Sequence, residues 1–203
     1  ACICRKIIEE LDIRLFSHVT SILDIHSKFR INTLSCIKSL NEKADQSPVR
    51  CLDEDSEIKM INAIDKAKIN GDSVGGQFEV VVSGLPYGLG SYTHWERKLN
   101  SQVSQMLMSI NALKSIEFGN IHLIRTQTGS KVHDQMKDSE GKISRVTNNS
   151  GGIEGGMSNA QPLVLRMTMK PLSSLVKPLN SVDINTNEVK KAHTERSDSC
   201  AVP

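Results

Sequence analysis

Residues 163–170 read LVLRMTMK, and this stretch decides the fold because its side chains alternate in the manner of a half-buried β-strand. One face of the strand carries Leu163, Leu165, Met167 and Met169, and the other carries Val164, Arg166, Thr168 and Lys170. Pro171 follows and has no main-chain N–H to donate, which ends the strand at Lys170. We therefore expect a strand that turns one face toward an aliphatic core.

Around this strand, the spacing of apolar residues predicts a mixed α/β chain. Recurrence at three- and four-residue steps predicts helices over 1–11, 56–70 and 94–113. Alternation predicts strands over 13–19, 77–82, 115–125 and 162–169, a hairpin-like stretch over 127–147 and a short strand in VDIN at 182–185. We expect the helices to bury broad faces, with Trp95 and Met106 in the core.

Two helix ends carry their own signals. Gly71 is positioned to end the second helix, since glycine adopts the left-handed conformation that a helix end requires. Thr93 and Glu96 have the spacing of a capping box in front of the third helix. The polar range 32–55 is interpreted as a variable excursion with a short helix, inside a chain whose residues 1–203 form part of a single domain.

Composition excludes several classes of protein. Lys and Arg number 25 against 23 Asp and Glu, and no basic block is interleaved with aromatic residues, so nucleic acid is not an expected partner. The apolar runs are strand-length, far below the roughly 20 residues of a membrane span. The five cysteines show no metal-ligand or disulfide-framework spacing, which favours reduced thiols in a cytoplasmic protein with no metal.

The two ends of the chain predict a fragment. The sequence opens on Ala1 without a methionine, in what reads as the middle of an amphipathic helix, and it stops at Pro203. We expect a longer protein around it.

Three polar loops lie between the predicted elements and are candidates for a site. The first, NNSGGIEGGMSNA at 148–160, has glycines that let main-chain N–H groups approach a ligand, or that form two tight turns. The second contains Lys170, Ser173 and Ser174, which suit a phosphate or a ring carbonyl, or are merely solvated. The third pairs Arg196 with Asp198, either for an anionic ligand and proton transfer or as a surface ion pair. Residue chemistry alone leaves these alternatives open.

Six motifs in order carry a resemblance to a known family. They read GDSVGG (71–76), GLPYGLGSYTHWERKL (84–99), SINALKSIEFG (109–119), NNSGGIEGGMSNAQP (148–162), MKPLSSLVKPLNSVDI (169–184) and ERSDSCAVP (195–203). Together they closely resemble chorismate synthase, in the bacterial form whose late motif reads ERSD. The likeness covers nearly the whole chain and is weakest over 32–55.

The resemblance implies a fold and an activity. The implied fold is an α+β, β-α-β sandwich with antiparallel sheets around internal helices, assembled as a homotetramer. The implied activity is that of a lyase in aromatic amino-acid biosynthesis, which converts 5-enolpyruvylshikimate-3-phosphate to chorismate by anti-1,4-elimination of the 3-phosphate and a C6 hydrogen. It requires reduced FMN without net redox change, and the flavin carries the hard chemistry. NADPH reduces the flavin in some members, and an external reductant does so in others.

Site residues follow from the same resemblance. The implied FMN contacts are Asn111, Ala112, Gly155, Lys170, Pro171, Leu172, Ser173, Ser174 and Arg196. Asp198 matches the aspartate that assists deprotonation at the flavin N5. Arg196 is also expected to face the anionic groups of the substrate.

The chain departs from the family pattern in ways that bear on activity. The amino-terminal G-E-S-H-G, R-R-P-G-type and R-S-S-A-R-E segments are absent, and with them both catalytic histidines and most substrate-binding arginines. We therefore expect the isolated chain to be inactive. Ala160 stands where the family usually has glycine, and it would need a backbone conformation open to other residues.

Two hypotheses from other classes compete with the enzyme. A non-catalytic flavin- or nucleotide-binding protein would keep the glycine and lysine loops without the chemistry. An oligomer-forming structural piece would show no flavin-dependent spectral change.

Overall fold

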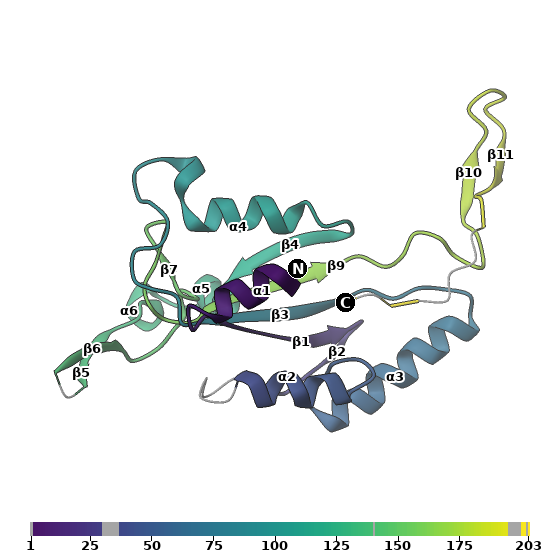
Figure 1. The fold of residues 1–203 in the computed structure, drawn as a ribbon. Coiled ribbons are helices and arrows are strands. Elements are labelled where there is room, and N and C mark those ends of the chain that lie inside the picture. Colours follow the sequence, from purple (N-terminus) through teal and green to yellow (C-terminus); the bar gives the residue numbers. More distant parts are fainter. Residues whose placement is uncertain (1, 30–36, 140, 195–199, 202) are drawn as a thin grey trace.

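The structure is a computed structural model that describes residues 2–29, 37–139, 141–194, 200, 201 and 203. At its centre lies a five-stranded sheet with the order β2-β1-β3-β9-β4 (Figure 1). The strands are β1 (Arg14–Ile22), β2 (Ile25–His26), β3 (Gly76–Ser83), β4 (Leu113–Phe118) and β9 (Leu163–Met169). Every neighbouring pair in this sheet is antiparallel. The α+β class expected from the resemblance is confirmed.

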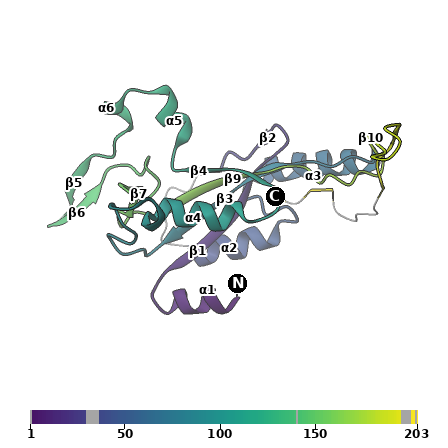
Figure 2. The same ribbon diagram turned by 90° about the horizontal axis from the view of Figure 1, so that it is seen from above.

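Strand β9 has the two faces that its sequence predicts. Leu163, Leu165 and Met167 are buried on one face. Helix α4 (Leu99–Met108) covers that face and contributes Val103 and Leu107 to its core (Figures 1 and 2). Burial of aliphatic side chains here supplies the usual driving force of about 25 cal/mol per Å² of apolar surface.

The opposite face of the sheet is apolar at one end and polar over the rest. Phe16, Val81 and Val164 form the apolar end, under helix α2 (Ile37–Gln46), which supplies Ala44. A third cluster, around Met60 of α3 (Glu54–Ile69), packs against Val19 and Ile22 of β1 on the other face, the one that carries Phe78 and the core under α4. The remainder of the face opposite α4 carries charged and hydroxyl side chains, because the alternation of β1, β3 and β9 places them there.

Of the two predicted helix-end signals, the glycine at the end of α3 is confirmed and the capping box before α4 is wrong. After α3, the N–H of Asp72 donates to Ala67 O at 2.9 Å and that of Gly71 to Lys68 O at 3.0 Å, with Gly71 at φ +70°, so the glycine end is confirmed. The capping box is wrong. Trp95–Arg97 form a short 3-10 helix (η1), and Lys98 at ψ 133° breaks the helical course before α4 begins.

This break also explains why Trp95 is not in the predicted core, whereas Met106 lies inside α4 on its exposed side. Trp95 and Met106 are each 71% exposed. Trp95 precedes the extended Lys98 and is out of phase with the helical face that contacts the sheet. In α1 (Cys2–Glu9) and just after it, Ile3, Ile7 and Leu11 are exposed as well, so its broad face is not buried in this chain.

The strand predicted over 115–125 ends early. β4 stops at Phe118 because Gly119 takes φ +69° and Asn120 starts helix α5 (Ile121–Thr126), its side chain accepting from Leu123 N at 3.1 Å. A four-residue helix, α6 (Gly129–Val132), follows. The expected hairpin-like stretch then contains β5 (Met136–Ser139) and β6 (Lys142–Arg145), which pair antiparallel.

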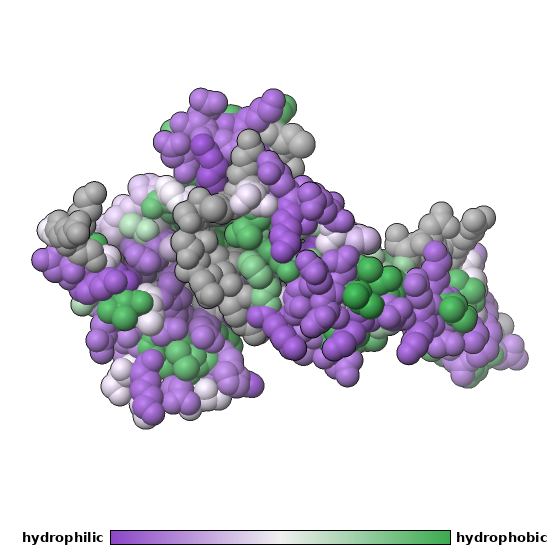
Figure 3. Space-filling model, turned by 90° about the horizontal axis from the view of Figure 1, so that it is seen from below, coloured by the Kyte–Doolittle hydropathy of each residue, from purple (hydrophilic) through white to green (hydrophobic). Residues whose placement is uncertain are grey.

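Two further hairpins lie outside the main sheet. β7 (Ile153–Glu154) and β8 (Met157–Ser158) form a small hairpin from the glycine cluster. β10 (Asn180–Val182) and β11 (Val189–Lys191) form an arm that projects from the body (Figure 1), and VDIN contributes only Val182 to it. Seen from below in Figure 3, the surface is mostly polar, with scattered apolar patches. No helix of the described residues is both long and apolar enough to cross a membrane.

Candidate functional site

The segments SINA (109–112) and KPLSS (170–174) meet at one end of the sheet. Lys170 N donates a hydrogen bond to Ala112 O at 2.9 Å, and the next residue of β4, Leu113, pairs with Met169 of β9. Ala112 turns the chain from α4 into β4 at φ +70°. We call this place the Ala112–Lys170 junction. It brings Asn111, Ala112 and Lys170 together.

The turn at 71–76 holds the lysine loop in position. Ser73 Oγ donates to Leu172 O at 2.6 Å. A Cβ at Gly75 would lie 2.6 Å from Met169 O and 2.9 Å from a ring carbon of Pro171, so only glycine lets these segments approach so closely. Lys170 and Ser173 are exposed and Ser174 is half-buried, which leaves an ammonium and hydroxyls available to a ligand.

The glycine cluster divides into packing glycines and one open glycine. A Cβ at Gly151 would lie 2.2 Å from Gly119 N, one at Gly152 2.5 Å from Pro162 O, and one at Gly156 2.7 Å from Ser91 O. These three glycines are required by close approach of main chain to main chain. Gly155, at φ +60°, has nothing within 4 Å of its Cβ position. Packing therefore explains three glycines of the cluster and leaves the surface of Gly155 free.

Gly155 and the Ala112–Lys170 junction lie at opposite ends of α4. Leu99, the first residue of α4, donates its N–H to Gly156 O at 2.7 Å, whereas Ala112 follows the carboxyl end of that helix. The 10 residues of α4 span about 15 Å. Within one chain, the structure thus groups the expected flavin contacts into two sets and does not bring them together.

Arg196 and Asp198 lie outside the described residues. Just beyond them, Val74 donates its N–H to Cys200 O at 2.8 Å, and Val74 and Ala201 form a parallel bridge. The described end of the chain therefore lies beside the same turn that holds Leu172.

A polar cavity of about 480 Å³ was not predicted from the sequence. It lies on the polar face of the sheet, and at its base Glu79 Oε1 accepts from His18 Nε2 at 3.4 Å while Oε2 contacts Arg166 Nε at 2.7 Å. The only sequence signal for it is the alternation in β9, which places Arg166 on the polar face of that strand. The pairing of three strands that are distant in sequence could not be read from spacing.

Electrostatics at this cavity favour an ionised Glu79. Burial of Glu79 opposes ionisation, but the hydrogen bond from His18 and the positive charge of Arg166 outweigh it and hold the pKa of the carboxyl below its usual value. A carboxylate that is ionised accepts hydrogen bonds and donates none. No group of three or more His, Cys, Asp or Glu side chains in the described part of the chain is arranged to hold a metal ion.

An antiparallel sheet with α4 on one face and α2 over the apolar end of the other defines the class as α+β. Comparison with known families then narrows it. The chorismate synthase family model matches residues 1–203, and the chain belongs to that family.

Individual relatives agree with the family model. The chain is 48% identical over 202 residues to "Chorismate synthase 2" of Bacillus cereus (strain ATCC 10987 / NRS 248) and 47% identical over 202 residues to "Chorismate synthase" of Bacillus subtilis (strain 168). Each alignment covers 99% of this chain and 51% of the relative. A solved structure titled "Crystal Structure of Chorismate Synthase" matches with a TM-score of 0.76 and 36% identity, over 84% of this chain and 52% of that chain. The chain thus spans about half the length of the relatives it matches.

Proposed function

We propose that this chain is part of an enzyme that converts 5-enolpyruvylshikimate-3-phosphate to chorismate by anti-1,4-elimination of phosphate. Membership of the chorismate synthase family over the whole chain supports the reaction. The observation that carries the proposal is the Ala112–Lys170 junction, because it joins two of the motifs that the family resemblance assigns to flavin binding.

The junction residues fit an anionic flavin. Lys170 and Ser173 are exposed there and offer an ammonium and a hydroxyl, both suited to a phosphate. At the other end of α4, the open surface of Gly155 would accept the flat face of a ring without steric conflict. Asn111, Ala112, Pro171, Leu172 and Ser174 would complete the contacts. When bound, reduced FMN would supply the electronic assistance that the elimination needs.

Arg196 and Asp198 have the remaining proposed roles. Arg196 would bind an anionic group of the flavin or substrate through its planar, permanently charged guanidinium. Asp198 would hold or move a proton near the flavin N5. The substrate carries two carboxylates and a phosphate, so a fixed positive charge at Arg196 lowers the cost of bringing it into the site.

The proposal extends to the surroundings of the full-length protein. We infer a cytoplasmic homotetramer that uses FMN, with NADPH or an external reductant as the source of electrons. Because the chain spans about half of its relatives, we expect the isolated 203-residue chain to be inactive.

The test uses the full-length protein that contains this chain. Chorismate formation is measured anaerobically with chemically reduced FMN, and flavin binding is followed by its absorbance. We expect turnover, and we expect Asp198→Asn to reduce kcat at least tenfold while flavin affinity stays similar. Asp24→Asn is the matched control, since Asp24 is exposed in the turn between β1 and β2.

Three outcomes separate the hypotheses. Turnover by the full-length protein supports the enzyme. Flavin binding without turnover would instead establish a non-catalytic flavin-binding protein. Absence of both would leave a structural, oligomer-forming role. Separately, turnover by the isolated chain would overturn the expectation that the remaining polypeptide is required.

A further inference from the structure

The polar cavity on the face of the sheet opposite α4 is built by residues that lie in register across four strands. His18 of β1 pairs with Glu79 of β3, Glu79 with Arg166 of β9, and Arg166 with Glu117 of β4. The cavity lining also includes Thr20, His26, Gln77, Asn120 and His122. A sheet face that buries such groups must satisfy their charges and hydrogen bonds.

Both oxygens of Glu79 are already used. Oε1 accepts from His18 and Oε2 contacts Arg166, and the glutamate is only 6% exposed. The negative charge of Glu79 therefore balances the positive charge of Arg166. Neither of its oxygens is left free to bind a cationic ligand. Each oxygen of Glu79 thus has a partner, whereas Nδ1 of His18 has none in the described part of the chain; this nitrogen is an acceptor in the neutral ring and a donor in the protonated ring.

His18 is the first source of unused capacity. Its side chain is 1% exposed, and its Nδ1 is buried without a hydrogen-bond partner among the described residues. Phe16 stacks on the ring with centroids 5.1 Å apart and Phe29 meets it edge-on at 5.5 Å, so the ring is held in place. Leaving a buried polar atom unpaired is unfavourable, and a ligand that pairs with His18 Nδ1 would recover this cost.

Arg166 is the second source. Its Nε contacts Glu79, and its Nη1 donates to Gly119 O at 3.1 Å. A guanidinium has five N–H groups, so others remain for a ligand, and the side chain is 28% exposed at the cavity. Hydrogen bonds from such a charged donor to an anionic oxygen are the strong kind.

We propose that this cavity binds a small oxyanion, a carboxylate or phosphate group, between the guanidinium of Arg166 and the imidazole of His18. The anion accepts from Arg166 and from His18 Nδ1–H, and His18 carries its second proton while it is bound. Besides His18, the charged and titratable groups that line the cavity are Glu79, Arg166, Glu117, His26 and His122. Glu117 opposes the anion and limits its affinity. The site is independent of the flavin contacts and is measured without turnover.

The test titrates the full-length protein with acetate and, separately, with inorganic phosphate. Calorimetry measures affinity, and NMR of ¹⁵N-labelled histidine reports whether Nδ1 of His18 gains a proton. We expect saturable binding of at least one anion with a change in the His18 Nδ1 signal, and the preferred anion identifies the ligand group. Binding of neither anion, or binding without a change at His18, overturns the proposal.

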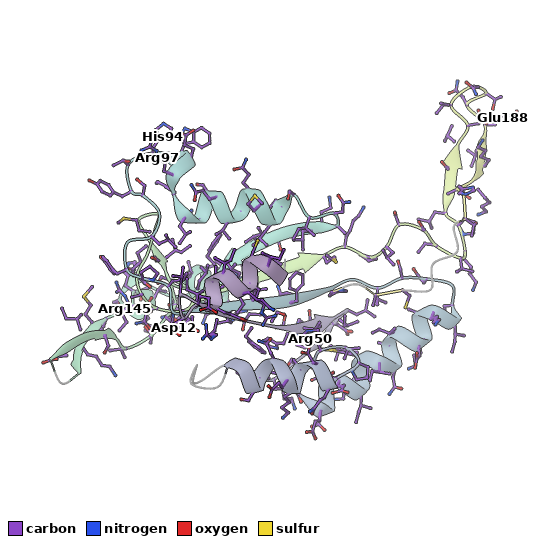
Figure 4. The ribbon with its side chains drawn as sticks, in the orientation of Figure 1. Asp12, Arg50, His94, Arg97, Arg145 and Glu188 are labelled. Atoms are coloured by element: carbon purple, nitrogen blue, oxygen red, sulfur yellow. The ribbon has the colours of Figure 1, made fainter. Side chains whose placement is uncertain are left out.

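Two variants are expected to change the anion affinity in opposite directions. Arg166→Lys keeps a positive charge beside Glu79, so the fold is retained, but it removes the planar donor and should weaken anion binding at least tenfold. Glu117→Gln removes a repelling charge and should tighten binding several-fold. Arg97→Lys is the matched control, because Arg97 lies on the turn before α4, away from the sheet (Figure 4). Equal affinity in wild type and Arg166→Lys, or weaker binding in Glu117→Gln, would contradict the assignment.

Discussion

The main-chain N–H of Lys170 donates to the carbonyl of Ala112 at 2.9 Å, which joins two motifs that lie far apart in the sequence. This hydrogen bond continues the β4–β9 ladder by one step, from Leu113 and Met169 into the loops that follow. The exposed lysine and serine of one loop are therefore held by the same sheet that forms the core. Rigid strands that present loop residues are a common basis for binding sites.

Gly155 and Gly152 should respond differently to the same substitution. Gly155→Val, in open space at φ +60°, should cost about 1–2 kcal/mol of stability and weaken FMN binding by the full-length protein by at least tenfold. Gly152→Val, whose Cβ would lie 2.5 Å from Pro162 O, should cost roughly 2–4 kcal/mol. Flavin titration and denaturant unfolding measure the two effects. Unchanged flavin affinity in Gly155→Val would show that Gly155 serves only the turn and does not contact the flavin.

Ala160→Gly should stabilise the protein. Ala160 is exposed and adopts φ +62°, a conformation that costs a residue with a Cβ about 1–2 kcal/mol. Glycine removes this strain, but it also raises the conformational entropy of the unfolded chain. The net gain in the free energy of unfolding should therefore be about 0.5–1 kcal/mol. Thermal unfolding measures it. Ala63→Gly, within helix α3, is the control and should destabilise by about 1 kcal/mol; a loss of stability in Ala160→Gly would contradict the prediction.

Glu79 should make the protein sensitive to acid. Its pKa is lower in the folded state than in the unfolded chain, so its contribution is fully present above the unfolded value of about 4.3 and is lost as the pH falls through the folded value. Glu79→Gln should destabilise at neutral pH by about 3 kcal/mol, because Arg166 loses its buried counter-charge and one acceptor oxygen becomes an NH2 donor. It should also flatten the dependence of unfolding free energy on pH in this acid range.

Unfolding measured as a function of pH tests this prediction. Glu188→Gln is the control, since Glu188 lies in the exposed arm (Figure 4). An acid dependence that is as steep in Glu79→Gln as in wild type would assign the effect to other carboxyls.

Asp134 should anchor the β5–β6 hairpin to the glycine cluster. Its Oδ1 accepts from Thr147 Oγ1 at 2.5 Å and Asn149 N at 2.7 Å, and its Oδ2 accepts from Ser150 N at 2.9 Å. Asp134→Asn replaces one acceptor oxygen with a donor and should cost about 1–2 kcal/mol. Amide hydrogen exchange at Asn149 and Ser150 should accelerate. Asp138→Asn, in the same hairpin but bonded to Gly141 N, is the control and should leave those two amides unchanged.

Local patterns predicted the elements whose ends are set by neighbouring residues. Gly71 ends α3 as expected, and alternation in β9 assigned the buried face to Leu163, Leu165 and Met167. The prediction failed where one local signal competed with another. Asn120 caps a helix directly after Gly119, so the apolar residues that follow are helical and not part of the strand.

Burial was harder to predict than secondary structure. The spacing of Trp95 and Met106 resembles a core stripe, but a helix is buried only where another element covers it. Lys98 interrupts the helix and turns Trp95 outward. No pattern within the segment reports what lies across from it.

The sequence by itself determined the family, through the order of its motifs. It also determined the strand faces and turn positions, because alternation and glycine conformations are local properties. Only the tertiary structure decided which glycine of the cluster is open, that Gly155 lies a helix length from Lys170, and that His18, Glu79 and Arg166 share one cavity. These facts depend on strand register and on close approach between segments distant in sequence. Such contacts are fixed by the packing of the whole sheet, since each strand alone fits several registers.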